Sequence, residues 1–222
     1  MSAFITHSDG YGSLTSAGYF LSIVIMVAVF LIGLSIVGHR QHMTAKTLAF
    51  SAVSLAIAFI LSYVKLWQMP WGGSVTLCSM LFVVIVAYWY GPSVGIIVAF
   101  TFSMLQFIQD GGAYILSPLQ ACMDYFFAFT ALGLAGFFSH KKNGFIKGYI
   151  LAVICRGIFH SIGGALFWMS GMPASFPKSI SFLWPIVYNY AYLIPEMVLT
   201  LIIISLPPVK KGLNNVTALA RS

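Results

Sequence analysis

Residues 149–169 read YILAVICRGIFHSIGGALFWM, an apolar run in which Arg156 is the one Lys, Arg, Asp or Glu. A helix needs about 20 predominantly apolar residues to cross the hydrocarbon core of a bilayer. This run is long enough, and it would carry Arg156 and His160 into the membrane. Six more apolar runs are separated by turn signals such as Gly91-Pro92. We therefore expect seven spans, at 17–38, 47–66, 75–90, 93–109, 115–138, 149–169 and 184–206.

The composition agrees with a membrane protein. The chain has 222 residues, of which 60% are hydrophobic and 7% charged, and its mean hydropathy is +0.96. Soluble domains carry about a quarter charged residues. A soluble enzyme, a disordered chain and a disulfide-stapled secreted domain are excluded, because none could keep so much apolar surface from water. The fold class that we predict is all-α, a polytopic membrane helical bundle.

The basic residues are distributed unevenly between the two sides of the predicted membrane topology. The first run is preceded by Asp9 and followed by Arg40, which reverses the charge order of a signal peptide. With the N-terminus outside, two basic residues, Lys65 and Lys178, fall outside. Eight fall inside: Arg40, Lys46, Lys141, Lys142, Lys147, Lys210, Lys211 and Arg221. This asymmetry fits the positive-inside rule. We therefore expect a multi-pass cell-membrane protein with a cytoplasmic C-terminus.

Four ionisable residues lie at bilayer depth, where each is a functional candidate: Asp124, Arg156, His160 and Glu196. With a rise of 1.5 Å per residue, Asp124 and His160 lie ~12 Å below the outer surface, and Asn189 lies ~8 Å below it. Polar groups from three helices thus converge on the outer half. Each of these residues also has a purely structural alternative. Asp124 and His160 would then hydrogen-bond neighbouring protein groups only, and Arg156 would pair with Glu196.

Aromatic residues surround the same depth, namely Trp168, Trp184, Tyr188 and Tyr192. Such residues collect at membrane interfaces whatever the function. Beside a carboxylate, however, they would form a cage for a flat organic cation, because ring faces attract positive charge. Asn189 adds a donor and an acceptor for the edge of a heterocycle.

The run 47–66 has a different character. Ala52 and Ala56 form a small-xxx-small face, which lets another helix approach closely. This face either packs inside the bundle or docks on a partner membrane protein.

The sequence lacks the usual motifs of ATP and zinc chemistry. It has no GxxxxGK[ST] loop and no HExxH, and its cysteines show no ligand spacing. We therefore expect no enzyme activity, no metal and no cofactor. The basic residues form no aromatic-interleaved patch, so nucleic acid is not an expected partner.

Several stretches together resemble the thiamine-specific S-component of energy-coupling factor (ECF) transporters, the ThiT or YuaJ type. The resemblance covers about residues 47–208. It is carried by MPWGGSV at 69–75, AYILSPLQ at 113–120, DYFFAF at 124–129, LGLAG at 132–136, HSIGGA at 160–165 with Trp168, and YNYAYLIPE at 188–196.

The resemblance implies a six-helix membrane protein that captures thiamine at its outer face. Such a protein works with a transmembrane coupling subunit and two ATPase subunits. The family's pocket residues carry over to Tyr114, Asp124, Tyr125, His160, Trp168 and Asn189. Ala52 and Ala56 correspond to the face that contacts the coupling subunit. We expect Trp71 and its loop, 71–74, to close the mouth.

Two features depart from the family. Trp184 stands where the family has a tyrosine, five residues before Asn189, so the ligand hydrogen bond of that tyrosine does not carry over to this chain. The helix 17–38 is additional, and it either anchors the chain or packs beside the docking helix.

We therefore divide the chain into an extra helix with its extracellular lead (1–40), a six-helix binding domain (41–211) and a cytoplasmic tail (212–222). The rival functions are a stand-alone channel or proton-coupled carrier, which would use Asp124, His160 and Glu196 as a proton path, and an intramembrane enzyme.

Overall fold

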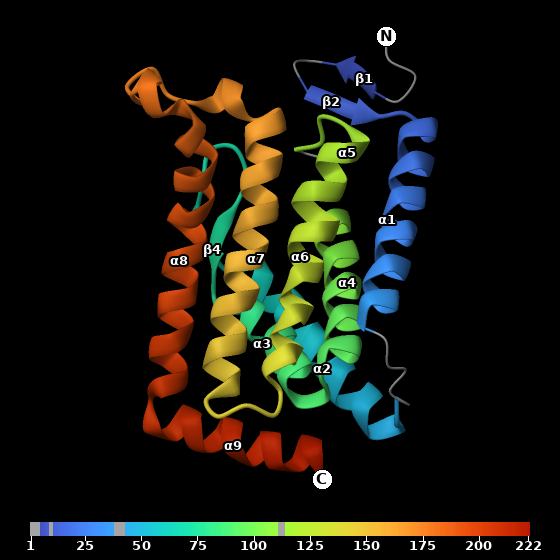
Figure 1. The fold of residues 1–222 in the computed structure, drawn as a ribbon, viewed down its shortest axis with the longest axis vertical. Helices are drawn as coiled ribbons and strands as arrows, with labels where there is room; N and C mark the ends of the chain where they lie inside the picture. Colours follow the sequence, from blue (N-terminus) through green and yellow to red (C-terminus); the bar gives the residue numbers. More distant parts are fainter. Residues whose placement is uncertain (1–4, 9–10, 38–42, 111–113) are drawn as a thin grey trace.

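The computed structural model describes residues 5–8, 11–37, 43–110 and 114–222. The chain forms a bundle of helices that run up and down along one direction (Figure 1). The long helices are α1 (Ser16–Val37), α2 (Ala45–Ser62), α4 (Pro92–Gln109), α7 (Gly144–Phe167) and α8 (Trp184–Ser205). Among the described residues, five helical segments are long and apolar enough to cross a membrane: Ala45–Ser62, Pro92–Gln109, Pro118–Phe138, Gly144–Phe167 and Lys178–Ser205. The predicted helical membrane bundle is confirmed.

The remaining elements are shorter. The N-terminal hairpin pairs β1 (Ile5–Ser8) with β2 (Tyr11–Leu14). A second antiparallel hairpin pairs β3 (Lys65–Gln68) with β4 (Ser74–Thr76) and leads into α3 (Ser79–Tyr90). The segment 118–138 combines α5 (Pro118–Ala121), the π-helix η1 (Cys122–Phe127), α6 (Ala128–Thr130) and the 3-10 helix η2 (Ala131–Phe138). Two 3-10 turns, η3 (Met169–Gly171) and η4 (Lys178–Leu183), connect α7 to α8.

The sequence prediction made two neighbouring spans too long, the first at its C-terminal end and the second at its N-terminal end. The predicted helix 47–66 ends at Ser62, and the predicted 75–90 begins only at Ser79. Gly72 and Gly73 both adopt positive φ, which reverses the chain between β3 and β4. The apolar residues around this turn therefore form a hairpin rather than helix ends. The short α3 has nine buried residues of twelve, so it lies inside the bundle and needs no lipid-spanning length.

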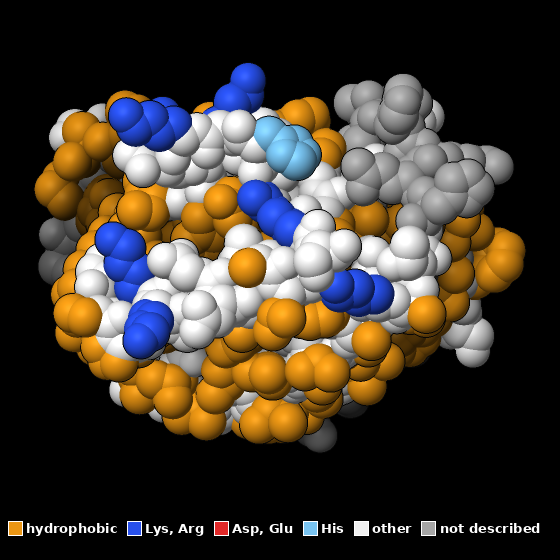
Figure 2. All heavy atoms as spheres, turned by 90° about the horizontal axis from the view of Figure 1, so that it is seen from below, with side chains coloured by type: hydrophobic (Ala, Val, Ile, Leu, Met, Phe, Trp, Pro, Cys, Tyr) orange, Lys and Arg blue, Asp and Glu red, His pale blue; other side chains and the backbone are white. Residues whose placement is uncertain are grey.

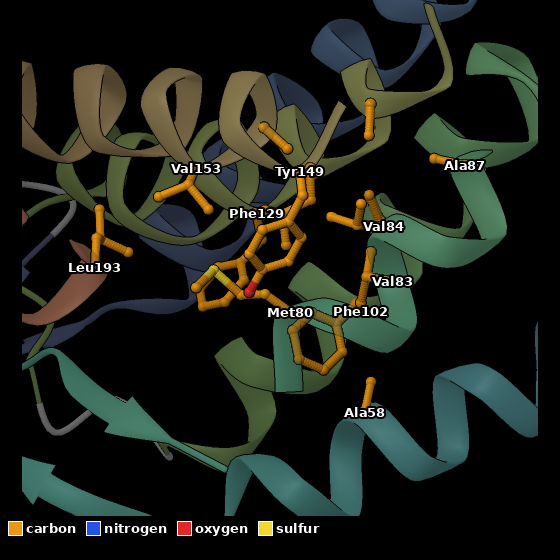
Figure 3. Packing of buried hydrophobic residues seen from close by; sticks show 14 of the residues in the cluster. Ala58, Met80, Val83, Val84, Ala87, Phe102, Phe129, Tyr149, Val153 and Leu193 are labelled. Carbon is orange, nitrogen blue, oxygen red and sulfur yellow. The ribbon is translucent and has the colours of Figure 1, made fainter. Parts of the chain in front are cut away.

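The core is built around α3. Met80, Val83 and Val84 of α3 pack against Phe102, Phe129 and Tyr149, which come from α4, α6 and α7 (Figure 3). Glycines bring the neighbouring segments close: a Cβ on Gly133 would lie 2.5 Å from the backbone N of Ile96, so η2 and α4 approach at backbone distance.

The C-terminal helix α9 (Pro207–Arg221) was not predicted. It crosses one end of the bundle (Figure 1). Trp89 Nε1 donates a hydrogen bond to Thr217 Oγ1 at 2.9 Å, and the Arg221 guanidinium donates to the carbonyls of Tyr88 and Ser139. Among the described residues, this end carries basic side chains and Figure 2 shows no acidic one there. Asp9 and Arg40, which entered the topology argument, and the 40/41 domain boundary lie outside the described residues.

Candidate functional site

A cavity opens at the end of the bundle opposite α9. It contains about 1140 Å³ of atom-free space, part of it open to solvent, and its walls come from the β3–β4 hairpin, α4, η1, α7 and α8. All eight residues that the sequence suggested for ligand binding line it: Trp71, Tyr114, Asp124, Tyr125, His160, Trp168, Trp184 and Asn189. Ligand cavities commonly combine apolar walls with a few convergent polar groups, and this one does so.

Asp124 is the polar centre of the cavity. Its Oδ2 accepts a hydrogen bond from Gln120 Nε2 at 2.6 Å and another from Trp168 Nε1 at 2.9 Å. Its Oδ1 lies 3.6 Å from His160 Nδ1. A Cβ on Gly163 would lie 2.6 Å from Oδ1, so the glycine lets the carboxylate approach α7. The carboxylate side chain is 16% exposed, and it therefore keeps a face toward the cavity.

His160 is held on both sides. Arg156 Nε donates to His160 Nε2 at 3.3 Å, which leaves the proton of a neutral imidazole on Nδ1, facing Asp124. The Arg156 guanidinium lies 4.0 Å from the centre of the Phe129 ring. The suggested pairing of Arg156 with Glu196 is wrong as a direct contact, because Glu196 accepts hydrogen bonds from the Thr76 amide and hydroxyl, both at 2.8 Å.

The side-chain amide of Asn189 makes most of its hydrogen bonds to other groups of the protein. Its Nδ2 donates to the carbonyls of His160 and Pro185, and its Oδ1 accepts from Tyr192 Oη at 2.9 Å. Only the second lone pair of Oδ1 is left for a ligand. The bond to the His160 carbonyl ties α8 to α7 behind the cavity, whereas the bond to the Pro185 carbonyl stays within α8.

Aromatic side chains make the rest of the wall. Trp184 lies 5.4 Å from Tyr188, centre to centre, and Tyr188 lies 6.4 Å from Tyr192. On the other side Tyr125 donates a hydrogen bond to Asp110 Oδ2 at 2.9 Å, and Tyr114 lies against the hairpin turn at Gly72. Ala113, which precedes Tyr114 in the quoted motif, lies outside the described residues.

The β3–β4 turn lines the cavity and is fastened to α8. The amide of Trp71 donates to Tyr188 Oη at 2.9 Å, and the same hydroxyl donates to the carbonyl of Gly72 at 3.0 Å. The Trp71 ring also lies against Gly171 of η3. One tyrosine hydroxyl thus joins the turn to α8 beside the cavity.

A polar strip that the sequence analysis missed lines the cavity beside the hairpin. Gln106 Nε2 donates to Ser62 Oγ and to Gln109 Oε1, and Lys65 lies nearby on β3. The spacing of Gln106 and Gln109, one helical turn apart at the end of an apolar run, was the available signal.

Acidic side chains outnumber basic ones on the wall of the cavity. All three acidic residues of the described chain line it, namely Asp110, Asp124 and Glu196, against two basic ones, Arg156 and Lys65. In their ionised forms the carboxylates exceed the basic groups by one. A cation is therefore the ligand that the electrostatics favour.

The small-residue face of α2 is separate from the cavity. Ala52 and Ala56 are exposed, whereas Ser51, Ser54 and Ala58 turn inward and are buried. Packing inside the bundle, one of the two readings of this face, therefore does not apply to Ala52 and Ala56.

The fold and the cavity define a class: a multi-pass helical membrane protein with a polar, aromatic-lined cavity open at one end. The sequence profile of the thiamine transporter protein family (Thia_YuaJ) matches residues 48–214. The chain belongs to this family, and it is accordingly a transporter and not an enzyme.

Two relatives support the assignment. The chain is 27% identical over 170 residues to the thiamine transporter ThiT of Bacillus subtilis (strain 168), an alignment that covers 70% of this chain and 86% of the relative. A solved structure of ThiT from Listeria monocytogenes superposes with a TM-score of 0.61 at 25% identity, covering 75% of this chain and 96% of that one. The additional helix α1 precedes the matched residues 48–214.

The fastening of the turn can be tested by Tyr188→Phe. The variant loses the hydroxyl that binds the Trp71 amide and the Gly72 carbonyl, and a hydrogen bond contributes about 1 kcal/mol net. We expect amide exchange at Trp71 to become about fivefold faster, as measured by hydrogen exchange of the purified protein. Tyr63→Phe, at a side chain that is 60% exposed, is the control. Equal exchange at Trp71 in the wild type and in Tyr188→Phe would contradict the fastening.

Proposed function

We propose that this protein captures thiamine in the cavity at the outer face of the membrane. Thiamine has a permanently charged thiazolium ring and a flat aminopyrimidine ring. The observation that carries the proposal is the Asp124 carboxylate, which faces the cavity among aromatic walls, together with the negative excess around it. Cations bind more tightly to aromatic faces and carboxylates when water is excluded.

In this mechanism the rings lie among Trp168, Trp184 and the neighbouring tyrosines. Asp124 opposes the positive charge or accepts from the amino group. His160 Nδ1 and the free lone pair of Asn189 Oδ1 contact the ring edges. The turn at Trp71 shields the ligand from water, and Tyr188 holds it closed.

Replacement of Asp124 tests the binding proposal. Asp124→Ala removes a charged hydrogen-bonding group from a shielded cavity, so we expect thiamine affinity to fall by on the order of 3 kcal/mol. Calorimetric titration of the purified protein measures this, with Trp67→Phe, an exposed tryptophan outside the cavity, as the control. Unchanged affinity in Asp124→Ala would mean that thiamine does not use this cavity.

We further infer an orientation with the cavity mouth outside and α9 in the cytoplasm. The described basic residues at the α9 end, Lys46, Lys141, Lys142, Lys147, Lys210, Lys211 and Arg221, support it through the positive-inside rule.

Cysteine labelling checks the orientation. In intact cells a membrane-impermeant maleimide should label Ser175→Cys, which lies in the exposed connection between η3 and η4. It should not label Lys141→Cys, exposed at the opposite end, until the cells are opened. The reverse pattern would overturn the orientation.

We also propose that delivery requires an ECF transmembrane coupling subunit and two ATPase subunits, with α2 as the docking helix. The support is the exposure of Ala52 and Ala56 together with the family resemblance. Small residues allow a second helix to pack at close distance within the bilayer. The sequence itself has no ATP-binding loop to drive transport.

A bulky side chain on α2 can test docking to the coupling subunit independently of thiamine binding. Ala56→Trp should keep thiamine affinity in the purified protein and abolish uptake in cells that express the coupling subunits, because the ring blocks close helix approach. Ala165→Trp, at an exposed alanine of α7, is the matched control and should keep uptake. Uptake into vesicles that contain this chain alone would contradict the coupled mechanism and favour a stand-alone carrier.

A further inference from the structure

The additional helix α1 packs against the segment that carries Asp124, on the side of that segment that faces away from the cavity. It contacts α4, α5 and η1 (Figure 1). Because the family profile begins at residue 48, this contact lies outside what the family match covers.

A row of aromatic rings joins α1 to η1. Phe30 of α1 stacks on Phe100 of α4, with ring centres 4.4 Å apart and an angle of 28° between the planes. Phe100 in turn lies 6.3 Å from Phe126 of η1. Ile25 and Phe30 both pack on the cluster formed by Phe100, Phe126 and the fully buried Cys122.

Asp124 lies on the other side of the same turn. Cys122 and Phe126 are four residues apart and share the face of η1 that packs toward α1. Asp124, midway between them, points to the opposite side, where it meets Trp168 and Gln120. One face of η1 therefore packs toward α1, and the opposite face presents the carboxylate to the cavity.

The π-helical conformation of η1 makes the packing on its outer face important for the geometry of the turn. A π-helix is rare, and it occurs mostly as a single turn at functional sites. The i→i+4 hydrogen bonds that would continue the flanking α-helices are replaced there by i→i+5 bonds. Packing on both faces of the turn then decides which of the two patterns persists.

We propose that α1 is a brace for the binding site and that Phe30 is a positioning residue for Asp124. Phe30 acts through Phe100 and Phe126 to hold the π-turn, which presents the carboxylate to the cavity. The ligand-affinity consequence rests on the proposed function, whereas the positioning of Asp124 does not.

The positioning is tested without ligand by NMR of the full-length protein, labelled with ¹⁵N in its tryptophan indoles. The Trp168 indole N–H donates to Asp124, so its signal reports the carboxylate position. Phe30→Ala should shift the Trp168 signal and leave that of Trp89 unchanged, since Trp89 bonds Thr217 near α9. Leu31→Ala, the adjacent residue with 57% exposure, is the matched control. Phe30→Leu, which keeps most of the apolar volume, should shift the Trp168 signal less and remains measurable if Phe30→Ala does not fold.

A Trp168 signal that stays in place in both Phe30 variants would overturn the brace. So would equal movement of the Trp168 and Trp89 signals, because it would show a general loss of stability rather than a local displacement.

Thiamine affinity adds a second readout. We expect Phe30→Ala to weaken binding about tenfold, within the range of coupling between packed neighbours. In an Asp124→Asn background the same change should weaken binding much less, since the group it positions has been altered. An equal loss in both backgrounds would overturn the mechanism through Asp124. If the wild type binds no thiamine, the proposed function fails while the NMR result still decides the brace.

Discussion

A carboxylate held within a membrane protein is the constraint on which the rest of the structure depends. An ionised Asp124 away from water is costly unless hydrogen-bond donors surround it. Its partners come from three places in the chain: Gln120 just before it, His160 on α7 and Trp168 after α7. The segment 118–138 and α7 must therefore meet with little between them, and Gly163 permits that approach.

The same constraint explains the separation of charge along the bundle. The described acidic residues all line the cavity, while most of the described Lys and Arg residues lie around α9 at the other end. An acidic cavity suits a cationic ligand, and a basic end is typical of the cytoplasmic side of a membrane protein. One bundle thus combines an acidic, aromatic-lined cavity at one end with basic side chains at the other.

The hydrogen bonds of the polar residues also favour capture over a proton path. Glu196 bonds Thr76 and thereby fastens the end of β4 to α8, whereas Asp124 and His160 face the cavity from η1 and α7. Asn189 of α8 joins α7 through its hydrogen bond to the His160 carbonyl. These residues hold the cavity walls together.

The sequence by itself determined the membrane class, most helix positions and the eight residues that converge on the cavity. Each of these follows from local patterns: long apolar runs, rare ionisable residues within them, and motifs shared with a family. Only the tertiary structure decided the β3–β4 hairpin, the brevity of the buried α3, the docking of α9 and the partners of Arg156 and Glu196. Hydropathy reports that a residue avoids water, and it cannot distinguish burial in lipid from burial against protein. Side-chain partners and the π-turn at Asp124 depend on packing between segments far apart in the chain, which no local pattern records.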